Sequence, residues 1–296
     1  MSEQRDIWSR YCDAAQNERR IGDLRLLAEE APSVGLKVVA YRSAACALLE
    51  TGHSSYARTL LETALELDPT DAVSRQQLAS LSAGLSTAVQ ASAHARRIFL
   101  FTGHMIDKKG RKEPRFPPDK ESLAAEAIAR AVQQLDAASG DLAICGGACG
   151  GDLLFAETCL KQGLSLELYL PFQEKEFIAR SVSFEKSPPG VTADTWFSRF
   201  QRTKNHPLTR MRITPDDLGP PPAVRDPYAR NNLRQLYTAL SHGPESVRVI
   251  ALWNGQTGDG PGGTADMIEQ AKARGARILI IDTTTLFQIK PSTGKG

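Results

Sequence analysis

Cysteine is scarce in this sequence, and long apolar runs are missing from it. Five cysteines among 296 residues follow no repeated spacing, so we expect a reduced, cytoplasmic protein without a disulfide framework. No apolar run approaches the roughly 20 residues of a membrane span, and the N-terminal stretch lacks the apolar segment of a secretory signal. A net charge of only +2 makes nucleic acid an unexpected partner. Cys145 and Cys149 lack the histidine pair that a zinc site would need, so no metal is expected.

The composition is instead that of a globular protein, with 41% apolar and 24% charged residues. The length allows two domains. Residues 1–95 have the apolar periodicity of helices throughout. Residues 96–296 alternate short apolar runs with helical patterns, which indicates a second domain of different character.

One stretch of the first domain has the residue spacing of a tetratricopeptide repeat. Large and small packing residues stand at the offsets of that repeat, namely Tyr41, Ala44, Ala45, Leu48, Ala57, Leu61, Ala64 and Pro69. One repeat cannot bury its own apolar face, so the helices need neighbours. We interpret this tetratricopeptide-like region either as a helical cap on the second domain or as a protein-docking surface.

The second domain has five apolar, β-branched runs, at residues 97–103, 142–147, 165–172, 247–255 and 276–283. Continuous apolar strands separated by helices predict a doubly wound α/β domain with a mostly parallel sheet of at least five strands. Ligands of such domains bind beyond the carboxyl ends of the strands. We call the loops at these ends the carboxyl rim.

Residues 173–245 make an unusually long connection between the third and fourth of these runs. Two helices are predicted within it, at roughly 192–204 and 226–241. Long loops are usually functional or disordered. We interpret the segment either as a lid over the carboxyl rim or as a floppy loop on the surface.

Glycines gather after the second and fourth runs. The first glycine loop, residues 146–151, comes before a predicted helix, and the second, residues 254–263, does the same. Glycines let the backbone approach a ligand, and helix starts offer unpaired N–H groups to an anion. The alternative for the first loop is a tight turn with Asp152 as N-cap. Two such loops favour one ligand with two phosphates, or with a phosphate and a ribose.

Neither of the common nucleotide fingerprints accounts for these loops. Gly258, Gly260 and Gly263 have dinucleotide-fingerprint spacing, but four residues separate the strand from the first glycine. No GxxxxGK[ST] sequence occurs, which argues against a P-loop nucleotidase. Thr264 is the predicted N-cap of the following helix. We predict a ligand site made of Gly103, His104, Arg111, Arg115, Gly146, Gly147, Gly150, Asp152, Asn231, Asn232, Asp259, Gly262, Gly263, Thr264 and Asp266.

Several long motifs of the second domain resemble the SLOG superfamily, over about residues 97–283. They are "FTGHMID" with "PRFP", "GGACGGDLLFAE", "LPF", "NNLRQLYTALSHGP" and "IALWNGQTGDGPGGTADMI". The resemblance implies a Rossmann-like domain that binds nucleotides or nucleotide-derived signals. Relatives include the ADP-ribose-sensing region of TRPM channels, the cyclic ADP-ribose sensor of Thoeris antiphage systems, the DNA-processing protein DprA and the LOG phosphoribohydrolases.

The LOG branch of that superfamily is enzymatic, and its motif PGGxGTxxE ends in a catalytic glutamate. Here Met267 stands at the glutamate position. Asp266 is one residue early, about 100° round the helix. Cleavage of an N-glycosidic bond needs a carboxylate near the developing cation. We therefore expect no catalytic residue, and keep a nucleotide phosphoribohydrolase as the alternative.

The resemblance implies recognition of an ADP-ribose-like or cyclic nucleotide signal in bacterial stress or antiphage signalling. The helical region would relay the bound state to a protein partner, or the ligand would drive assembly of a homo-oligomer. No cofactor is expected besides this nucleotide-type ligand.

Overall fold

The computed structural model describes residues 21–83, 96–183, 195–257 and 262–289. The chain divides into two compact units, 1–95 with 233–246, and 96–232 with 247–296. The division after Ala95 is where the sequence changes character, whereas residues 233–246 join the helical unit although the sequence prediction placed them in the second domain. Every described helix is too short or too polar to cross a bilayer.

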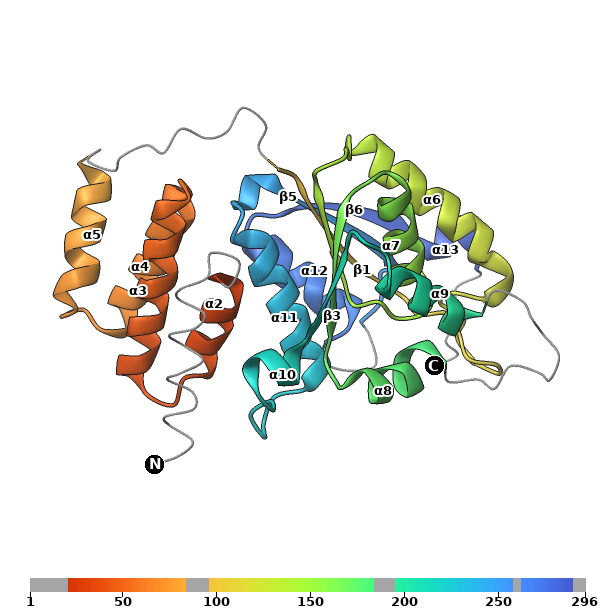
Figure 1. The fold of residues 1–296 in the computed structure, drawn as a ribbon, viewed down its shortest axis with the longest axis horizontal. Coiled ribbons are helices and arrows are strands. Elements are labelled where there is room, and N and C mark those ends of the chain that lie inside the picture. The colour runs from red at the N-terminus through yellow and green to blue at the C-terminus, as the bar shows by residue number, and fades with distance from the viewer. Residues whose placement is uncertain (1–20, 84–95, 184–194, 258–261, 290–296) are drawn as a thin grey trace, which may run out of the picture. The chain divides into compact units, whose positions relative to one another are not determined.

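In its described residues the helical unit has four helices before the sheet (Figure 1): α2 (Ile21–Glu30), α3 (Val34–Glu50), α4 (Ser54–Leu67) and α5 (Ala72–Ser82). Ser33 caps α3 by accepting from the amide of Leu36, and Asp71 caps α5 by accepting from that of Ser74. The predicted small packing residues Ala44, Ala45, Ala57 and Ala64 are fully buried. The helices are therefore confirmed, while their identity as a tetratricopeptide repeat stays a prediction.

A buried ion pair holds α2 to the end of α11 (Pro227–Leu240) inside this unit. Arg234 donates from Nε and Nη2 to the two carboxylate oxygens of Asp23, at 2.7 and 3.0 Å. Both residues are at most 4% exposed. Beside the pair, Tyr237 donates its hydroxyl to Glu29, and the helices touch so closely that a Cβ on Gly22 would lie 2.4 Å from the amide nitrogen of Thr238. α2 and this part of α11 therefore form one packed element.

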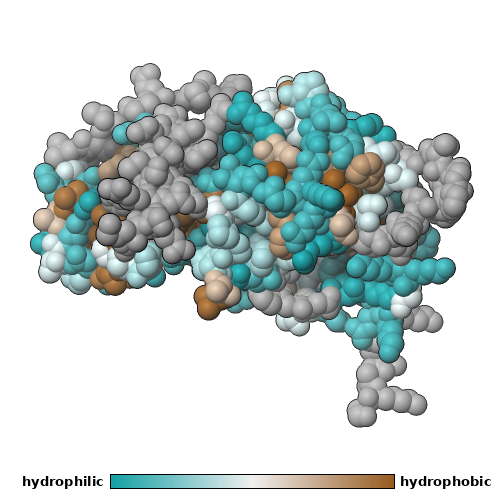
Figure 2. All heavy atoms as spheres, turned by 60° about the horizontal axis from the view of Figure 1, so that its bottom comes forward, coloured by the Kyte–Doolittle hydropathy of each residue, from teal (hydrophilic) through white to brown (hydrophobic). Residues whose placement is uncertain are grey.

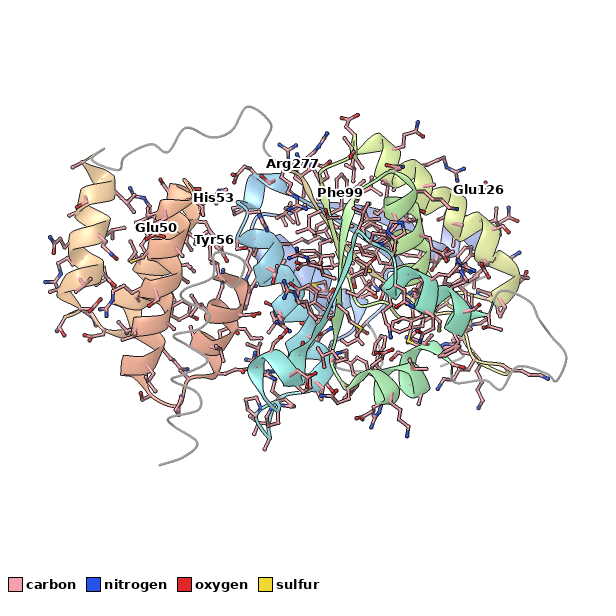
Figure 3. The ribbon with its side chains drawn as sticks, viewed as in Figure 1. Glu50, His53, Tyr56, Phe99, Glu126 and Arg277 are labelled. Atoms are coloured by element: carbon pink, nitrogen blue, oxygen red, sulfur yellow. The ribbon has the colours of Figure 1, made fainter. Side chains whose placement is uncertain are left out.

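The second unit is built on a six-stranded, all-parallel sheet, which confirms the α/β prediction. Its order is β4-β3-β2-β1-β5-β6. The strands are β1 (Ile98–Gly103), β2 (Leu142–Cys145), β3 (Ser165–Leu170), β4 (Thr209–Ile213), β5 (Val247–Trp253) and β6 (Arg277–Asp282). β1 runs through the middle of the core, where Phe99 is fully buried (Figure 3).

Helices cover both faces of this sheet. The chain passes from β1 to β3 in one direction through α6 (Glu121–Gln134) and α7 (Gly151–Lys161), and from β5 to β6 in the other through α12 (Thr264–Ala273). Because such crossovers are right-handed, α12 lies on the face opposite α6 and α7 (Figure 1). Shorter elements complete the unit: η2 (Pro118–Lys120), α8 (Glu174–Phe177), η3 (Ile178–Val182), α9 (Trp196–Lys204), α10 (Thr214–Leu218) and α13 (Thr283–Phe287), while η4 (Pro244–Ser246) belongs to the helical unit.

The structure corrects our interpretation of the long connection at 173–245. Its two predicted helices are present as α9 and α11, but between them lies β4, which pairs in parallel with β3 from Leu166↔Thr209 to Leu170↔Ile213. This part of the segment is the edge of the sheet and not a lid. The sequence "TRMRI" gave no strand signal because an edge strand buries little: none of its five residues is fully buried.

The buried ion pair of the helical unit generates a prediction for stability. Asp23→Ala leaves the guanidinium of Arg234 buried without its carboxylate, and we expect the free energy of unfolding to fall by about 3–5 kcal/mol. Urea denaturation measures this. Glu126→Ala, which removes the exposed partner of Arg130 at 3.5 Å, is the control and should cause a far smaller change. Equal losses in the two variants would contradict the assignment.

Candidate functional site

The strand order reverses beside β1. From β1 the chain moves outward through β2 and β3 to the edge strand β4, and then returns to β5 on the other side of β1. In open parallel sheets ligands bind at this reversal, at the carboxyl ends of the two strands. The loops after β1, β2 and β5 contain most of the predicted ligand residues. On the side shown in Figure 2, hydrophilic side chains dominate the described surface of this unit.

His104 and Asn254 connect the loops after β1 and β5. The amide of His104 donates to the carbonyl of Leu252 at 3.0 Å, which continues the pairing of the two strands. Its Nε2 lies 3.2 Å from both the backbone nitrogen and the Oδ1 of Asn254. A neutral Nε2 accepts from that amide, and a protonated one donates to that oxygen. His104 thus belongs to the reversal point itself, and Asn254 is a residue that the sequence reasoning missed.

The first glycine loop lies directly against the loop after β1. Gly150 pairs with Met105 in an antiparallel bridge, and the amide of Gly151 donates to the carbonyl of His104 at 3.1 Å. Gly150 has a φ of 93°, and a Cβ there would lie 2.5 Å from the amide nitrogen of Ile106. The positive φ and this close approach explain why residue 150 is a glycine. Packing also explains the glycine at position 103, since a Cβ there would lie 2.9 Å from the ring of Phe101.

Several amides of the first glycine loop are bonded within the chain. The amide of Cys149 donates to the carbonyl of Ser181 at 2.8 Å, and that of Ala148 to Oδ2 of Asp152 at 3.1 Å. With Gly151, three amides of this loop are therefore unavailable to an anion. The donors that we predicted from the sequence, Gly146, Gly147 and Gly150, stay a prediction.

Asp152 has a different role from the N-cap that the alternative interpretation of this loop assigned to it. Gly150 occupies the N-cap of α7, and the carboxylate of Asp152 folds back onto the amide of Ala148. Desolvation raises the pKa of Asp152 from 3.8 to about 7, although the hydrogen bond from Ala148 opposes the shift. Burial also raises the pKa of the Cys149 thiol to about 12, so this cysteine is no nucleophile at neutral pH.

The second glycine loop is held by the first half of α11. Asn232 donates its Nδ2 to the carbonyl of Gly262 at 2.6 Å, and a Cβ on Gly262 would lie 2.5 Å from the amide nitrogen of Ala229. Gly263 is the N-cap of α12, and no side chain caps the helix. Thr264, the predicted cap, is its first helical residue.

Two further predicted residues of this region have separate outcomes. Asp266 is half-buried in the first turn of α12, as expected from the sequence. Asp259 lies outside the described residues.

Both polar side-chain atoms of Asn231 are bonded within the fold. Its Oδ1 accepts from the hydroxyl of Thr214 at 2.7 Å, and its Nδ2 donates to the carbonyl of Tyr169 at 2.8 Å. The residue is 2% exposed. Asn231 therefore connects α11 to the ends of β3 and β4, and its contact with a ligand stays a prediction.

The basic loop after β1 is folded around Asp107. One carboxylate oxygen of Asp107 accepts from the amides of Arg115 and Phe116, at 2.8 and 2.9 Å. Arg111 lies with Nε 3.5 Å from the other oxygen and donates to the carbonyl of Glu113. The guanidinium of Arg111 is therefore partly engaged within its own loop. For Arg115 the structure fixes the backbone, and the role of both as counter-charges stays a prediction.

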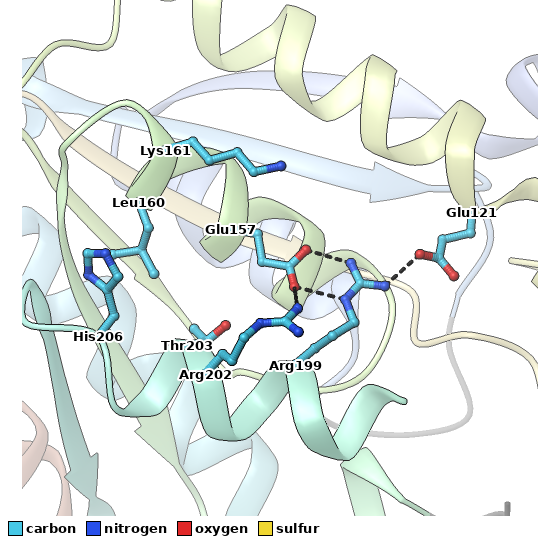
Figure 4. A pocket seen from close by; sticks show the side chains of 8 residues that line it. All are labelled: Glu121, Glu157, Leu160, Lys161, Arg199, Arg202, Thr203 and His206. Carbon is cyan, nitrogen blue, oxygen red and sulfur yellow. Dashed lines mark hydrogen bonds and ion pairs between the residues drawn. The ribbon is translucent and has the colours of Figure 1, made fainter. Parts of the chain in front are cut away.

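The described residues form a cavity but no cluster of metal-binding side chains. Among the described ranges, no three His, Cys, Asp or Glu side chains are grouped so as to hold a metal ion. A cavity of about 560 Å³ lies between α6, α7 and α9, and none of the predicted ligand residues lines it (Figure 4). The sequence did not predict this cavity, because it is formed only when three separate helices pack together.

The raised pKa of Asp152 generates a prediction for pH dependence. The folded state binds the extra proton between pH 3.8 and about 7, so its stability falls as pH rises through this window, by at most about 1.4 kcal/mol per pH unit. Asp152→Asn keeps an oxygen for the Ala148 amide and removes the titration. We expect the melting temperature of the wild type to fall relative to that of the variant as pH rises. Parallel curves would contradict this, and Asp119→Asn is the control at an exposed position.

Comparisons with known proteins leave the chain without an assigned family. No family model, no curated protein and no solved structure matches it. The candidate site therefore rests on the geometry of the three rim loops.

Proposed function

We propose that the sheet unit binds a nucleotide or nucleotide-derived ligand at the carboxyl rim beside β1 and β5. The observation that carries the proposal is the position of three loops. Those after β1 and β2 are bonded together through Gly150 and Gly151, and those after β1 and β5 through His104 and Asn254. All three meet at the reversal of the strand order, where parallel α/β proteins bind their ligands.

The groups at this position match the chemistry of a phosphorylated nucleoside. The uncapped start of α12 presents first-turn amides to an anion, which favours a phosphate there. The Oδ1 of Asn254 is engaged by His104 and the Gln256 amide, and its Nδ2 would donate to a ribose hydroxyl or a base edge. Arg111 and Arg115 in the neighbouring loop would supply counter-charge. Asn232 holds the loop before α12 through the carbonyl of Gly262.

The biological role follows from the resemblance of the sequence to the SLOG superfamily. In this proposal the ligand is an ADP-ribose-like or cyclic nucleotide signal of bacterial stress or antiphage signalling, and the protein is a cytoplasmic sensor. The bound state would pass to a protein partner through the tetratricopeptide-like region, or would drive homo-oligomer assembly.

A ligand panel with two matched glycine variants tests the site. Gly262→Ala places a Cβ 2.5 Å from the Ala229 amide nitrogen, whereas Gly255→Ala, in the same loop and also at positive φ, has nothing within 4 Å. We expect ADP-ribose, AMP or a cyclic nucleotide at about 100 times its dissociation constant to stabilise the wild type by ~2.7 kcal/mol. Gly255→Ala should retain the effect and Gly262→Ala should lose it. Thermal shift is the measurement, and a panel without any stabilising nucleotide would reject the proposal.

One observation favours the enzymatic alternative, a nucleotide phosphoribohydrolase. A carboxyl with a pKa of about 7, such as Asp152, keeps a proton near neutral pH and can donate it to a leaving base. Against it, Met267 stands at the position of the glutamate and is 2% exposed. Incubation with AMP separates the two functions. Catalytic release of adenine and ribose phosphate, lost in Asp152→Asn, favours the enzyme; stoichiometric binding without turnover favours the sensor.

A further inference from the structure

The cavity between α6, α7 and α9 shares no lining residue with the predicted ligand site at the rim. Its volume is about 560 Å³, within the ~300–1,000 Å³ typical of small-molecule sites. It is lined by Glu121, Glu157, Leu160, Lys161, Arg199, Arg202, Thr203 and His206 (Figure 4). We call it the α7–α9 groove.

Arg199 neutralises the acidic side of the groove. Its Nε and Nη2 donate to the two carboxylate oxygens of Glu157, at 2.8 and 2.5 Å, and its Nη1 to Glu121 at 2.5 Å. The guanidinium also lies 4.2 Å from the ring of Trp196. Desolvation by itself lowers the pKa of Arg199, but the bonds to Glu157 and Glu121 outweigh it and hold the pKa above its ordinary value. Both carboxylates are thus engaged by a permanent cation.

The remaining polar groups of the groove are donors. Thr203 is 3% exposed, yet its hydroxyl has no hydrogen-bond partner among the described residues. Lys161, an exposed residue in the last turn of α7, lines the groove as well. The Nδ1 of His206 accepts from the amide of Leu208 at 3.2 Å, so its proton is on Nε2. Arg202 lies 3.8 Å from Glu157 at the same opening.

We propose that the α7–α9 groove binds the phosphate of a small phosphorylated metabolite. The cations Lys161 and Arg202, a hydroxyl and an imidazole N–H line one space, and a phosphate has enough acceptor oxygens for all of them, whereas a carboxylate has two. The hydroxyl of Thr203 lines the groove and is available to an anion bound there. The volume exceeds that of a phosphate alone, so the ligand is an ester such as a sugar phosphate. This inference is independent of the proposed function at the rim.

Charge reversal with a matched control tests the groove. Inorganic phosphate and ribose 5-phosphate are titrated into the full chain by calorimetry, and the ring signals of His206 are followed by NMR. We expect ribose 5-phosphate to bind more tightly than phosphate and to shift the His206 signals. Lys161→Glu should weaken binding by about tenfold or more, and Thr203→Val by severalfold. Lys272→Glu makes the same charge change on exposed α12 and should leave the affinity unchanged.

Three outcomes would overturn the inference. The first is equal affinity in the wild type and Lys161→Glu. The second is binding that disappears in Gly262→Ala but survives in Lys161→Glu, since the phosphate would then occupy the rim. The third is binding of an oligonucleotide or an acidic peptide with no binding of either phosphate compound. Failure of nucleotides to bind at the rim has no bearing on these results, so the two proposals are tested separately.

Discussion

The architecture of the sheet unit depends on the close approach of three loops around the end of β1. Gly150 allows backbone-to-backbone pairing with Met105, and the amide of His104 continues the pairing between β1 and β5. No residue with a side chain fits at position 150, because a Cβ there would overlap the backbone at Ile106. The same contacts bring the polar groups of His104 and Asn254 to the reversal of the strand order. The fold and the candidate site therefore depend on the same backbone contacts.

The sequence predicted those parts of the fold that have a strong periodic signal. Apolar runs identified the five strands of the buried sheet and the helices between them. It missed β4 because an edge strand with alternating arginines buries little apolar surface. It also assigned to ligand binding some residues that the fold itself requires. Asn231, for example, is engaged on both polar atoms, and Gly150 is explained by packing. Composition cannot separate a glycine needed for a ligand from one needed for a close contact.

α7 contributes residues to both proposed sites. Its N-terminus is formed by the first glycine loop, and Glu157 and Lys161 line the α7–α9 groove farther along the same helix. Arg199 bonds this helix to the first residue of α6, which follows the basic loop after β1. The groove was invisible in the sequence because its residues come from three segments that are far apart in the chain. Only their packing shows that cations and a hydroxyl surround one space.

The central claim is that one ligand contacts all three loops at the carboxyl rim. Backbone amide NMR of the full chain, titrated with the nucleotide that stabilises it most, tests this directly. The account predicts saturable shifts in the loop after β1 at His104, in the first glycine loop near Gly147 and at the start of α12 near Thr264. Shifts confined to a single loop, or to residues away from the ends of β1, β2 and β5, would contradict it.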